Sequence, residues 1–440
     1  MQHYDALIKA RWIITVNQGN EILEHQALAL QGGKIMGFVP NHEVGSTVDA
    51  SRITDLSASH ALMPGFINAH THAAMNLLRG LADDLPLMDW LQQHIWPAEA
   101  KVVSPEFVHD GTLHACAEML RGGTTCFNDN YFFVDTAAAL VEKIGMRAVL
   151  AEALFNFPVP WSASYELGLA RAISTHLNYQ NSDLIRIALA PHAPYTTDLA
   201  LLQKTKALAD THDLLLHVHM HEGKHECQDY QNQHQYRPLM HYQQEGLLSK
   251  RWLSVHMCDC NNDDQDILHK LGLSIVHCPE SNMKLASGIC PVPALLKARV
   301  NVALGTDGAA SNNDLDMIGE MRSACFLAKV STGDPEAISA TEALRMATIN
   351  GAKALGLEAI IGSLEPGKEG DISAIDLGSI ETRPLFHPIA QIVYAGSRHD
   401  ITHVWVRGKA LLADRALTTI ELQEVQAKIA HWQEQLKRFD

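Results

Sequence analysis

The sequence predicts an α/β protein, a (β/α)8 TIM barrel with a small β-sandwich domain formed by the N- and C-terminal segments. The first observation is that apolar runs of strand length alternate with helical stretches between residues 61 and 365. Near-continuous apolar strands separated by helices are typical of a parallel sheet, and eight of them fit a closed barrel. The eight runs are 62–70, 122–128, 146–152, 184–190, 214–220, 252–257, 272–277 and 301–306. A doubly wound parallel sheet is the alternative fold.

The second observation concerns the polar residues, which gather where these runs end. His70 and His72 end the first run, and His192 follows the fourth. His256 ends the sixth run, and Asp307 follows the eighth. Barrel enzymes carry their sites on the face where the strands end. The sequence therefore predicts a functional site at this rim.

The third observation is that short strands and turns occupy both ends of the chain, with Gly32-Gly33 as one turn signal. The predicted organisation is residues 1–60 and 366–420 as a composite β-sandwich, residues 61–365 as the barrel, and residues 421–440 as a C-terminal helix. In that helix Leu422, Val425, Ile429 and Trp432 lie on one apolar stripe, which is typical of a packing helix.

Composition limits the classes of function. The chain has 440 residues, of which 47% are apolar, so a full core can be buried. Its net charge of −16 argues against a nucleic-acid partner, which needs basic surface. The eight cysteines include no C-x-x-C pair, the N-terminus lacks a signal-peptide pattern, and no apolar run has membrane length. We therefore expect a cytoplasmic protein with no membrane contact.

The end of the first run is the centre of the predicted site. Side chains alternate along a strand, so His70 and His72 face the same way and can share one divalent ion. The fifth run supplies the best third ligand from histidines that alternate on one face: His217, His219 and His221. Asp307 can supply a carboxylate, because the first and eighth strands of a closed barrel are neighbours. Three imidazoles and a carboxylate suit zinc best, with iron(II) possible.

A rival motif overlaps the fifth run. Residues 221–225 read H-E-x-x-H, the signature of zinc proteases. That chemistry needs both histidines on one helix, whereas here the motif straddles a strand end and contains Gly223, a poor helix former. The protease alternative also leaves His70, His72 and Asp307 without a role.

Several stretches together resemble the amidohydrolase superfamily. They are 64–72 (PGFINAHTH), 219–222 (HMHE), 254–256 (SVH), 277–282 (HCPESN) and 305–307 (GTD). The stretches 78–82 (LRGLA) and 96–99 (WPAE) narrow the resemblance to the branch that contains 5'-methylthioadenosine/S-adenosylhomocysteine deaminases and triazine hydrolases. The resemblance runs through almost the whole chain with its motifs in order, and it agrees with the barrel and the split sandwich.

The resemblance implies a metal centre. By position in the matching motifs, the metal ligands are His70, His72, His219 and Asp307. No lysine ends the fourth run, where family members with two metals carry a bridging lysine, so the resemblance implies one Zn²⁺ per subunit, or Fe²⁺. It also implies a homo-oligomer.

The resemblance further implies catalytic and substrate-binding roles. Glu222 matches a proton-shuttling glutamate that also contacts the substrate, and Asp307 takes the proton of the attacking water. His256 matches the histidine that orients the water or the substrate. Glu99 and His192 match substrate-binding positions, with Glu99 on the ribose hydroxyls.

The implied activity is hydrolytic deamination of the 6-amino group of 5'-methylthioadenosine, S-adenosylhomocysteine or adenosine, which yields the inosine analogue and ammonia. The alternative is an aminohydrolase or chlorohydrolase of a free purine, pterin or triazine ring, although Glu99 favours a substrate that carries a ribose. A catalytically dead scaffold would have lost a ligand, and all four are present.

Two loops bear on the substrate. Residues 155–161 contain no arginine, although some family members use arginines there to bind a substrate carboxylate. Residues 73–100 are rich in Leu, Met and Trp, and we expect part of this loop to cover an apolar substrate tail as a lid.

Overall fold

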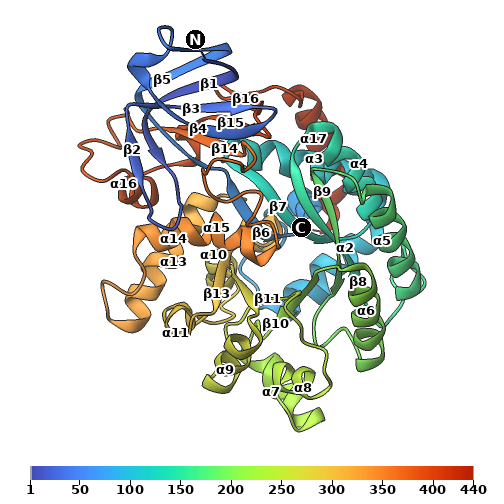
Figure 1. The fold of residues 1–440 in the computed structure, drawn as a ribbon. Helices are drawn as coiled ribbons and strands as arrows, with labels where there is room; N and C mark the ends of the chain where they lie inside the picture. The colour runs from blue at the N-terminus through green and yellow to red at the C-terminus, as the bar shows by residue number, and fades with distance from the viewer. Residues whose placement is uncertain (1, 440) are drawn as a thin grey trace.

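The computed structural model describes residues 2–439 and contains two sheets, which Figure 1 shows one above the other. The larger element is an eight-stranded parallel sheet in which each strand pairs with the next along the chain. Its strands are β6 (Phe66–Thr71), β7 (Thr124–Tyr131), β8 (Arg147–Leu154), β9 (Ile185–Pro191), β10 (Leu216–Met220), β11 (Trp252–His256), β12 (Ser274–His277) and β13 (Asn301–Leu304). Each strand overlaps one predicted run, so the (β/α)8 prediction is confirmed.

Helices surround this sheet and cap its rim. Those that follow the strands are α3 (Pro105–Arg121), α4 (Val134–Ile144), α5 (Tyr165–Tyr179), α6 (Leu199–His212), α7 (Lys224–His234), α8 (Pro238–Gln244), α9 (Asn262–Leu271), α10 (Pro279–Lys284), α11 (Val292–Lys297), α12 (Ala309–Asn312), α13 (Met317–Thr332), α14 (Ala340–Met346) and α15 (Ile349–Ala354). Between β6 and α3 lie four short helical segments: η2 (Ala73–Leu78), α1 (Leu87–Trp90), η3 (Leu91–Ile95) and α2 (Trp96–Val102).

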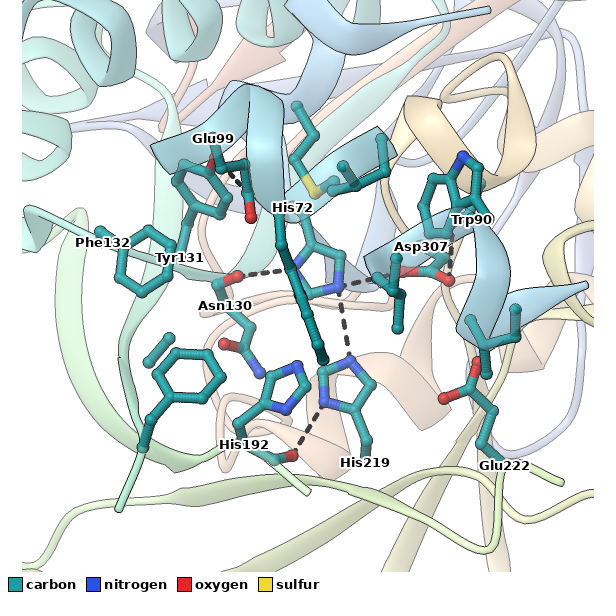
Figure 2. A pocket seen from close by; sticks show the side chains of 18 of the residues that line it. His72, Trp90, Glu99, Asn130, Tyr131, Phe132, His192, His219, Glu222 and Asp307 are labelled. Carbon is teal, nitrogen blue, oxygen red and sulfur yellow. Dashed lines mark hydrogen bonds and ion pairs between the residues drawn. The ribbon is translucent and has the colours of Figure 1, made fainter. Parts of the chain in front are cut away.

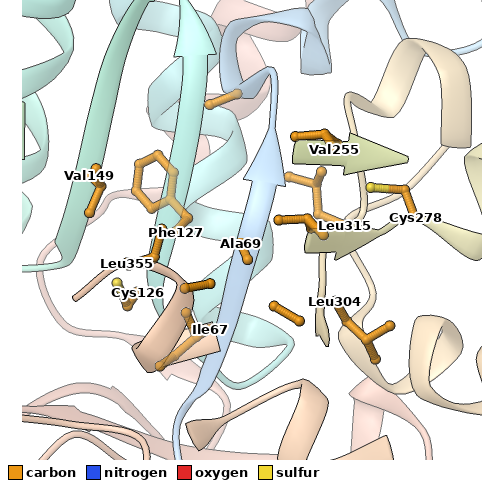
Figure 3. Close-up of a cluster of buried hydrophobic side chains, with 14 of the residues drawn as sticks. Ile67, Ala69, Cys126, Phe127, Val149, Val255, Cys278, Leu304, Leu315 and Leu355 are labelled. Atoms are coloured by element: carbon orange, nitrogen blue, oxygen red, sulfur yellow. The ribbon is translucent and has the colours of Figure 1, made fainter. Parts of the chain in front are cut away.

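Strand β6 has one apolar side and one polar side. Ile67 and Ala69 lie among apolar side chains of neighbouring elements, as Figure 3 shows. Gly351 of α15 packs so closely on Ile67 that an added Cβ would lie 3.0 Å from it, which places Ile67 on the helix side of the sheet. Because side chains alternate along a strand, Asn68 and His70 point into the barrel.

The barrel closes where β13 meets β6, and a side chain makes this junction. The amide of Asn68 donates to the hydroxyl of Thr306 at 2.7 Å and accepts from the N–H of Thr306 at 3.0 Å. The N–H of Asp307 donates to the carbonyl of His70 at 3.0 Å. Gly305 allows this approach, since a Cβ there would lie 2.7 Å from the backbone nitrogen of His70. The closure thus brings Asp307 beside the histidines of β6.

The second sheet is mixed and contains both ends of the chain. In Figure 1 its blue N-terminal strands and its orange C-terminal strands lie together above the barrel. Its nine strands are β1 (Gln2–Ile14), β2 (Ile22–Glu24), β3 (Gln26–Gln31), β4 (Lys34–Pro40), β5 (Val48–Pro64), β14 (Ile372–Asp376), β15 (Ile401–Val406), β16 (Lys409–Ala413) and β17 (Ala416–Leu417). The expected β unit built from both termini is confirmed, and the residue boundaries assigned to the domains stay a prediction.

A buried ion pair and one glycine join the two sheets. Strand β5 runs into β6 through Gly65, where a Cβ would overlap the side chain of Thr125. Arg147 of β8 pairs with Asp371, which directly precedes β14, at 2.9 Å. Both side chains are buried, and the N–H of Arg407 also donates to Asp371 at 2.9 Å. The barrel is therefore tied to the second sheet close to the start of β6.

The remaining helices lie in the C-terminal part of the chain: α16 (Pro388–Tyr394), η4 (Arg398–Asp400), α17 (Leu422–Leu436) and η5 (Lys437–Phe439), with η1 (Asn41–Glu43) near the N-terminus. Helix α17 packs on α3, where the indole of Trp432 donates to Asp110 at 3.0 Å. Of the predicted stripe, Val425 and Trp432 are buried, whereas Leu422 is 40% exposed. Within residues 2–439, no helix has both the length and the apolar character that a membrane span requires.

Replacement of Gly305 by alanine should disturb the barrel closure. The new methyl group would press on the backbone and Cβ of His70, and overpacking of this kind costs about 1–3 kcal/mol. We expect a lower urea midpoint for Gly305→Ala. Gly19→Ala is the control, because its nearest neighbour would lie at an ordinary 3.5 Å. Equal midpoints for the two variants would contradict the close approach.

Candidate active site

Four polar side chains converge at the rim where the barrel strands end. One donor atom from each of His70, His72, His219 and Asp307 lies within 4.8 Å of the others. Asp307 Oδ1 lies 3.1 Å from Nε2 of His70 and 3.2 Å from Nε2 of His72. The Nε2 atoms of His72 and His219 are 3.4 Å apart. The structure thus brings together all four residues that the sequence analysis named as metal ligands.

The other ring nitrogen of each histidine is held by a separate partner. His72 Nδ1 donates to the carbonyl of Asn130 at 2.5 Å, and His219 Nδ1 donates to the carbonyl of His192 at 2.9 Å. His70 Nδ1 lies 2.7 Å from Nε2 of His217. Such contacts fix ring orientation and leave Nε2 free to bind a metal. Three imidazole nitrogens and one carboxylate oxygen therefore form a donor set that fits a divalent ion.

The carboxylate of Asp307 is fixed at both oxygens. Oδ2 accepts hydrogen bonds from the hydroxyls of Ser281 at 2.7 Å and Ser311 at 2.9 Å. Burial by itself would raise the pKa of Asp307, but hydrogen bonds and charges from His70 and His72 hold that pKa well below its usual range. Burial would also lower the pKa of His72, yet Asp307 raises it to about 9. Asp307 therefore favours a positive charge on His72, whereas burial lowers the pKa of His70 to about 4.

A second carboxylate in the same pocket behaves in the opposite way. Glu222 follows β10 and is 5% exposed, and burial together with the negative charge of Asp307 raises its pKa to about 8. Glu222 is therefore protonated at neutral pH in the protein without a metal. Two nearby carboxylates with opposed pKa shifts are typical of acid and base partners.

His256 ends β11 and lies beside the cluster, with its ring centroid 5.5 Å from that of His219. Its Nδ1 accepts from the amide of Asn282 at 2.9 Å, which leaves the ring proton on Nε2. Nε2 is buried, lies 3.9 Å from Glu222 and has no hydrogen-bond partner among residues 2–439. Burial lowers the pKa of His256 to about 4, so the ring is neutral. An unpaired buried N–H of this kind is a donor available to a ligand.

The cluster forms one wall of a pocket of about 650 Å³, a volume that includes space open to solvent. Figure 2 shows His72 and His219 in its middle, with Glu99 and Glu222 on opposite sides. The hydroxyl of Tyr131 donates to Glu99 at 2.6 Å, and burial raises the pKa of Glu99 to about 7. His192 also lines the pocket, so every residue named for catalysis or substrate binding except His256 borders this space directly.

The loop between β6 and α3 covers the pocket. Apolar side chains from α1, η3 and α2 face the cavity: Leu87, Trp90, Leu91, Ile95 and Trp96. At the start of this loop, Asp83 accepts from Lys284 of α10 at 2.7 Å. The apolar cover expected from the composition of residues 73–100 is therefore present.

The protease alternative does not fit the structure. His221 has a left-handed backbone with φ of 52°, so it turns away from the line of His217 and His219. Its ring lies 3.5 Å from Asp264, outside the ligand cluster. His225 lies exposed on α7, and the two histidines share no helix.

Some contacts at the site were not predicted from the sequence. Ser281 lies within the 277–282 motif, but no motif contains Ser311, which is only four residues after Asp307 in the sequence. The carbonyl groups of Asn130 and His192, which hold two of the ligand histidines, are backbone atoms that every residue possesses. Only the path of the chain makes them useful here.

Comparison with known proteins places this arrangement in a class. A model of the amidohydrolase family matches residues 61–411, and the chain belongs to that family. A 5-methylthioadenosine/S-adenosylhomocysteine deaminase from Saccharophagus degradans is 43% identical over 429 residues, which cover 98% of this chain and 96% of that protein. The family expected from the motifs is therefore confirmed.

Two solved structures show the same architecture. An adenosine deaminase from Xanthomonas campestris with bound zinc has a TM-score of 0.97 and 44% identity, covering 99% of both chains. An atrazine chlorohydrolase from Arthrobacter aurescens complexed with zinc has a TM-score of 0.89 and 22% identity, covering 97% of this chain and 99% of that one. At that lower identity the likeness concerns the fold alone.

The raised pKa of Glu222 predicts a pH-dependent stability difference. The folded-state pKa of about 8 lies above the ordinary value of 4.5, so the native state holds this proton more tightly than the unfolded state. The free energy of unfolding of the metal-free protein should therefore decrease as pH rises from 4.5 to 8, whereas that of Glu222→Gln should lack this decrease. The difference amounts to a few kcal/mol at most (~1.4 per pKa unit). Urea unfolding at pH 5 and pH 9 measures the difference, and a gap that does not change with pH would contradict the shift.

Proposed function

We propose that this chain is a metal-dependent hydrolytic deaminase of adenosine-type nucleosides, acting on 5'-methylthioadenosine or related 5'-substituted adenosines. The observation that carries the proposal is the order of groups along one pocket. A metal-type donor set lies in the middle, protonated Glu222 lies on one side, and Glu99 lies on the other. That order matches a purine ring followed by a ribose diol. The names of the full-length relatives support the same chemistry.

The metal would be held by His70, His72, His219 and Asp307. When bound, the ion would lower the pKa of a water molecule and make hydroxide available near neutral pH. We propose zinc, one ion per chain, with iron(II) as the second choice, because the nitrogen-rich donor set suits both. A homo-oligomeric state and a cytoplasmic location complete the proposal.

The protein side chains would carry the protons of the reaction. Glu222 donates its proton to ring nitrogen N1 while the water oxygen adds to C6. Asp307 accepts the proton of that water, and the N–H of His256 Nε2 donates a hydrogen bond to the oxygen. Asp307 then passes its proton to the amino group, and ammonia leaves. The remaining proton on the C6 oxygen returns to Glu222 as the carbonyl of the inosine analogue forms. General acid and base catalysis of this kind contributes roughly 10²–10⁴-fold.

Glu99 and His192 would position the ribose. The carboxylate of Glu99 keeps one oxygen for a ligand, because Tyr131 occupies the other. The remaining oxygen, with its two lone pairs, can accept hydrogen bonds from ribose hydroxyls. A free purine, pterin or triazine ring, the alternative substrate class, would leave the second oxygen of this buried carboxylate without a partner, which is unfavourable.

The assignment of the metal ligands predicts that two histidine variants differ in zinc content. His219→Ala removes one of four donors and should lower the zinc content of protein reconstituted with one equivalent of zinc. His225→Ala, the matched control, removes an exposed side chain from α7 and should leave zinc content unchanged. Elemental analysis after gel filtration measures both. Zinc loss in His225→Ala alone would overturn the assignment and restore the protease motif.

The activity itself predicts ammonia release from adenosines and a central role for Glu222. We expect zinc-loaded protein to release ammonia from 5'-methylthioadenosine or adenosine, and not from guanine, pterins or triazines. Glu222→Gln should lower kcat by about 10²–10⁴-fold with zinc retained, since the amide has no proton to transfer. Turnover of free bases alone would favour the alternative. Normal turnover by Glu222→Gln would remove Glu222 from the mechanism.

A further inference from the structure

We infer that the pocket ends in an aromatic subsite for a short, uncharged 5'-substituent, so that the enzyme selects 5'-alkylthioadenosines over S-adenosylhomocysteine. This inference rests on the proposed function, because it assigns the part of the substrate beyond the ribose. It concerns the side of the pocket that carries Glu99.

The position of the subsite follows from the arrangement of the pocket. Figure 2 shows Glu222 on one side, and Glu99, Tyr131 and Phe132 together on the opposite side. With the reacting ring between Glu222 and the metal ligands and the ribose at Glu99, the 5' carbon points towards Phe132. The loops that follow β7 and β8 supply the residues at this end of the pocket.

The residues at this end form a continuous aromatic wall. Phe155 lies 4.8 Å from the ring of His192 and 5.9 Å from that of Phe132, measured between ring centroids. Phe132 in turn contacts Trp161 at 4.5 Å, and Phe155 contacts Phe157 at 5.4 Å. Such a wall offers apolar surface against which a methylthio group can be buried.

A side cavity of about 270 Å³ continues the pocket behind this wall. Phe132, Ala153 and Phe155 line both spaces, so the cavities adjoin. The side cavity adds Phe157, Val159 and a few hydroxyl groups to its lining.

Neither cavity offers a basic side chain of lysine or arginine to a substrate. No lysine or arginine belongs to the lining that residues 2–439 provide for either space, whereas four carboxylates do: Glu99, Glu152, Glu222 and Asp307. The nearby Arg171 is already engaged, since it pairs with Glu152 at 2.6 Å and stacks over the ring of Phe133 at 4.5 Å. The lining at this end is therefore aromatic, with Glu99 and Glu152 as its carboxyl groups and no cationic side chain among residues 2–439.

The lack of cationic side chains at this aromatic end favours a neutral 5'-tail over a charged one. A methylthio group carries no charge and needs only apolar contact. The homocysteine tail ends in an ammonium and a carboxylate, and the carboxylate would lose its water next to aromatic rings and acidic side chains. A buried charge without a partner is strongly disfavoured, and we expect selectivity of about 100-fold or more.

Three substrates test the inference on the zinc-loaded enzyme. Initial rates of ammonia release give kcat/KM for 5'-methylthioadenosine, S-adenosylhomocysteine and 5'-n-butylthioadenosine, whose neutral tail is about as long as homocysteine. We expect kcat/KM for S-adenosylhomocysteine to be at least about 100-fold lower than for 5'-methylthioadenosine, and kcat/KM for the butyl analogue to be within about 10-fold of the 5'-methylthioadenosine value.

Comparable values for all three would overturn the inference and leave the proposed function intact. A butyl analogue as poor as S-adenosylhomocysteine would overturn it in favour of exclusion by size. Absence of ammonia from all three would remove the proposed function, and the inference with it.

A charge placed in the side cavity tests the location. Phe157 lines this cavity and is 42% exposed, so arginine there can reach the tail while keeping contact with water. Phe157→Arg should raise the ratio of kcat/KM for S-adenosylhomocysteine to that for 5'-methylthioadenosine by about 10-fold, through one charge-assisted hydrogen bond. Phe157→Met, the control, removes the ring without adding charge and should not raise the ratio. An unchanged ratio in a folded Phe157→Arg protein would place the 5'-tail elsewhere and overturn the subsite.

Discussion

The contact between β6 and β13 is the constraint on which the site depends. Asn68 bonds both the N–H and the hydroxyl of Thr306, and the next N–H, that of Asp307, bonds the carbonyl of His70. These bonds close the barrel and set the carboxylate of Asp307 against two histidines from the far end of the sheet. Gly305 makes the approach possible because it carries no side chain. The same few bonds therefore complete the fold and assemble the metal-type cluster.

Burial then gives two carboxylates opposite character within one pocket. Asp307 is surrounded by histidines and hydroxyl donors, which stabilise its charge and keep its pKa low. Burial and the negative charge of Asp307 raise the pKa of Glu222, and the opposing effect of His72 is smaller. One pocket thus contains one carboxyl group that stays ionised and one that holds its proton, although both have similar intrinsic chemistry. The environment makes the difference, as in other enzymes that use two carboxylates.

The rest of the molecule holds this rim in place and covers it. The buried pair of Arg147 and Asp371 ties the barrel to the sheet built from both chain ends, close to the strand that carries His70. On the opposite side, the segments α1, η3 and α2 lay apolar side chains over the pocket. Exclusion of water strengthens every electrostatic interaction inside, which is what proton transfer to a ring nitrogen requires.

Much of this protein was determined by the sequence alone. Strand periodicity predicted eight barrel strands, and the position of polar residues at run ends predicted a site at one rim, because both follow from local rules of alternation and burial. The four residues of the cluster were also named in advance. The barrel topology itself makes its first and last strands neighbours.

Only the tertiary structure decided the rest. The left-handed turn at His221 separates it from His217 and His219, which local alternation had placed on one face. Ser311 and the carbonyls that hold the histidines have no sequence signature, since any residue can supply a carbonyl. The pKa shifts of Glu222 and Asp307 likewise depend on neighbours distant in sequence. Backbone direction and burial are properties of the whole fold, and no short stretch of residues specifies them.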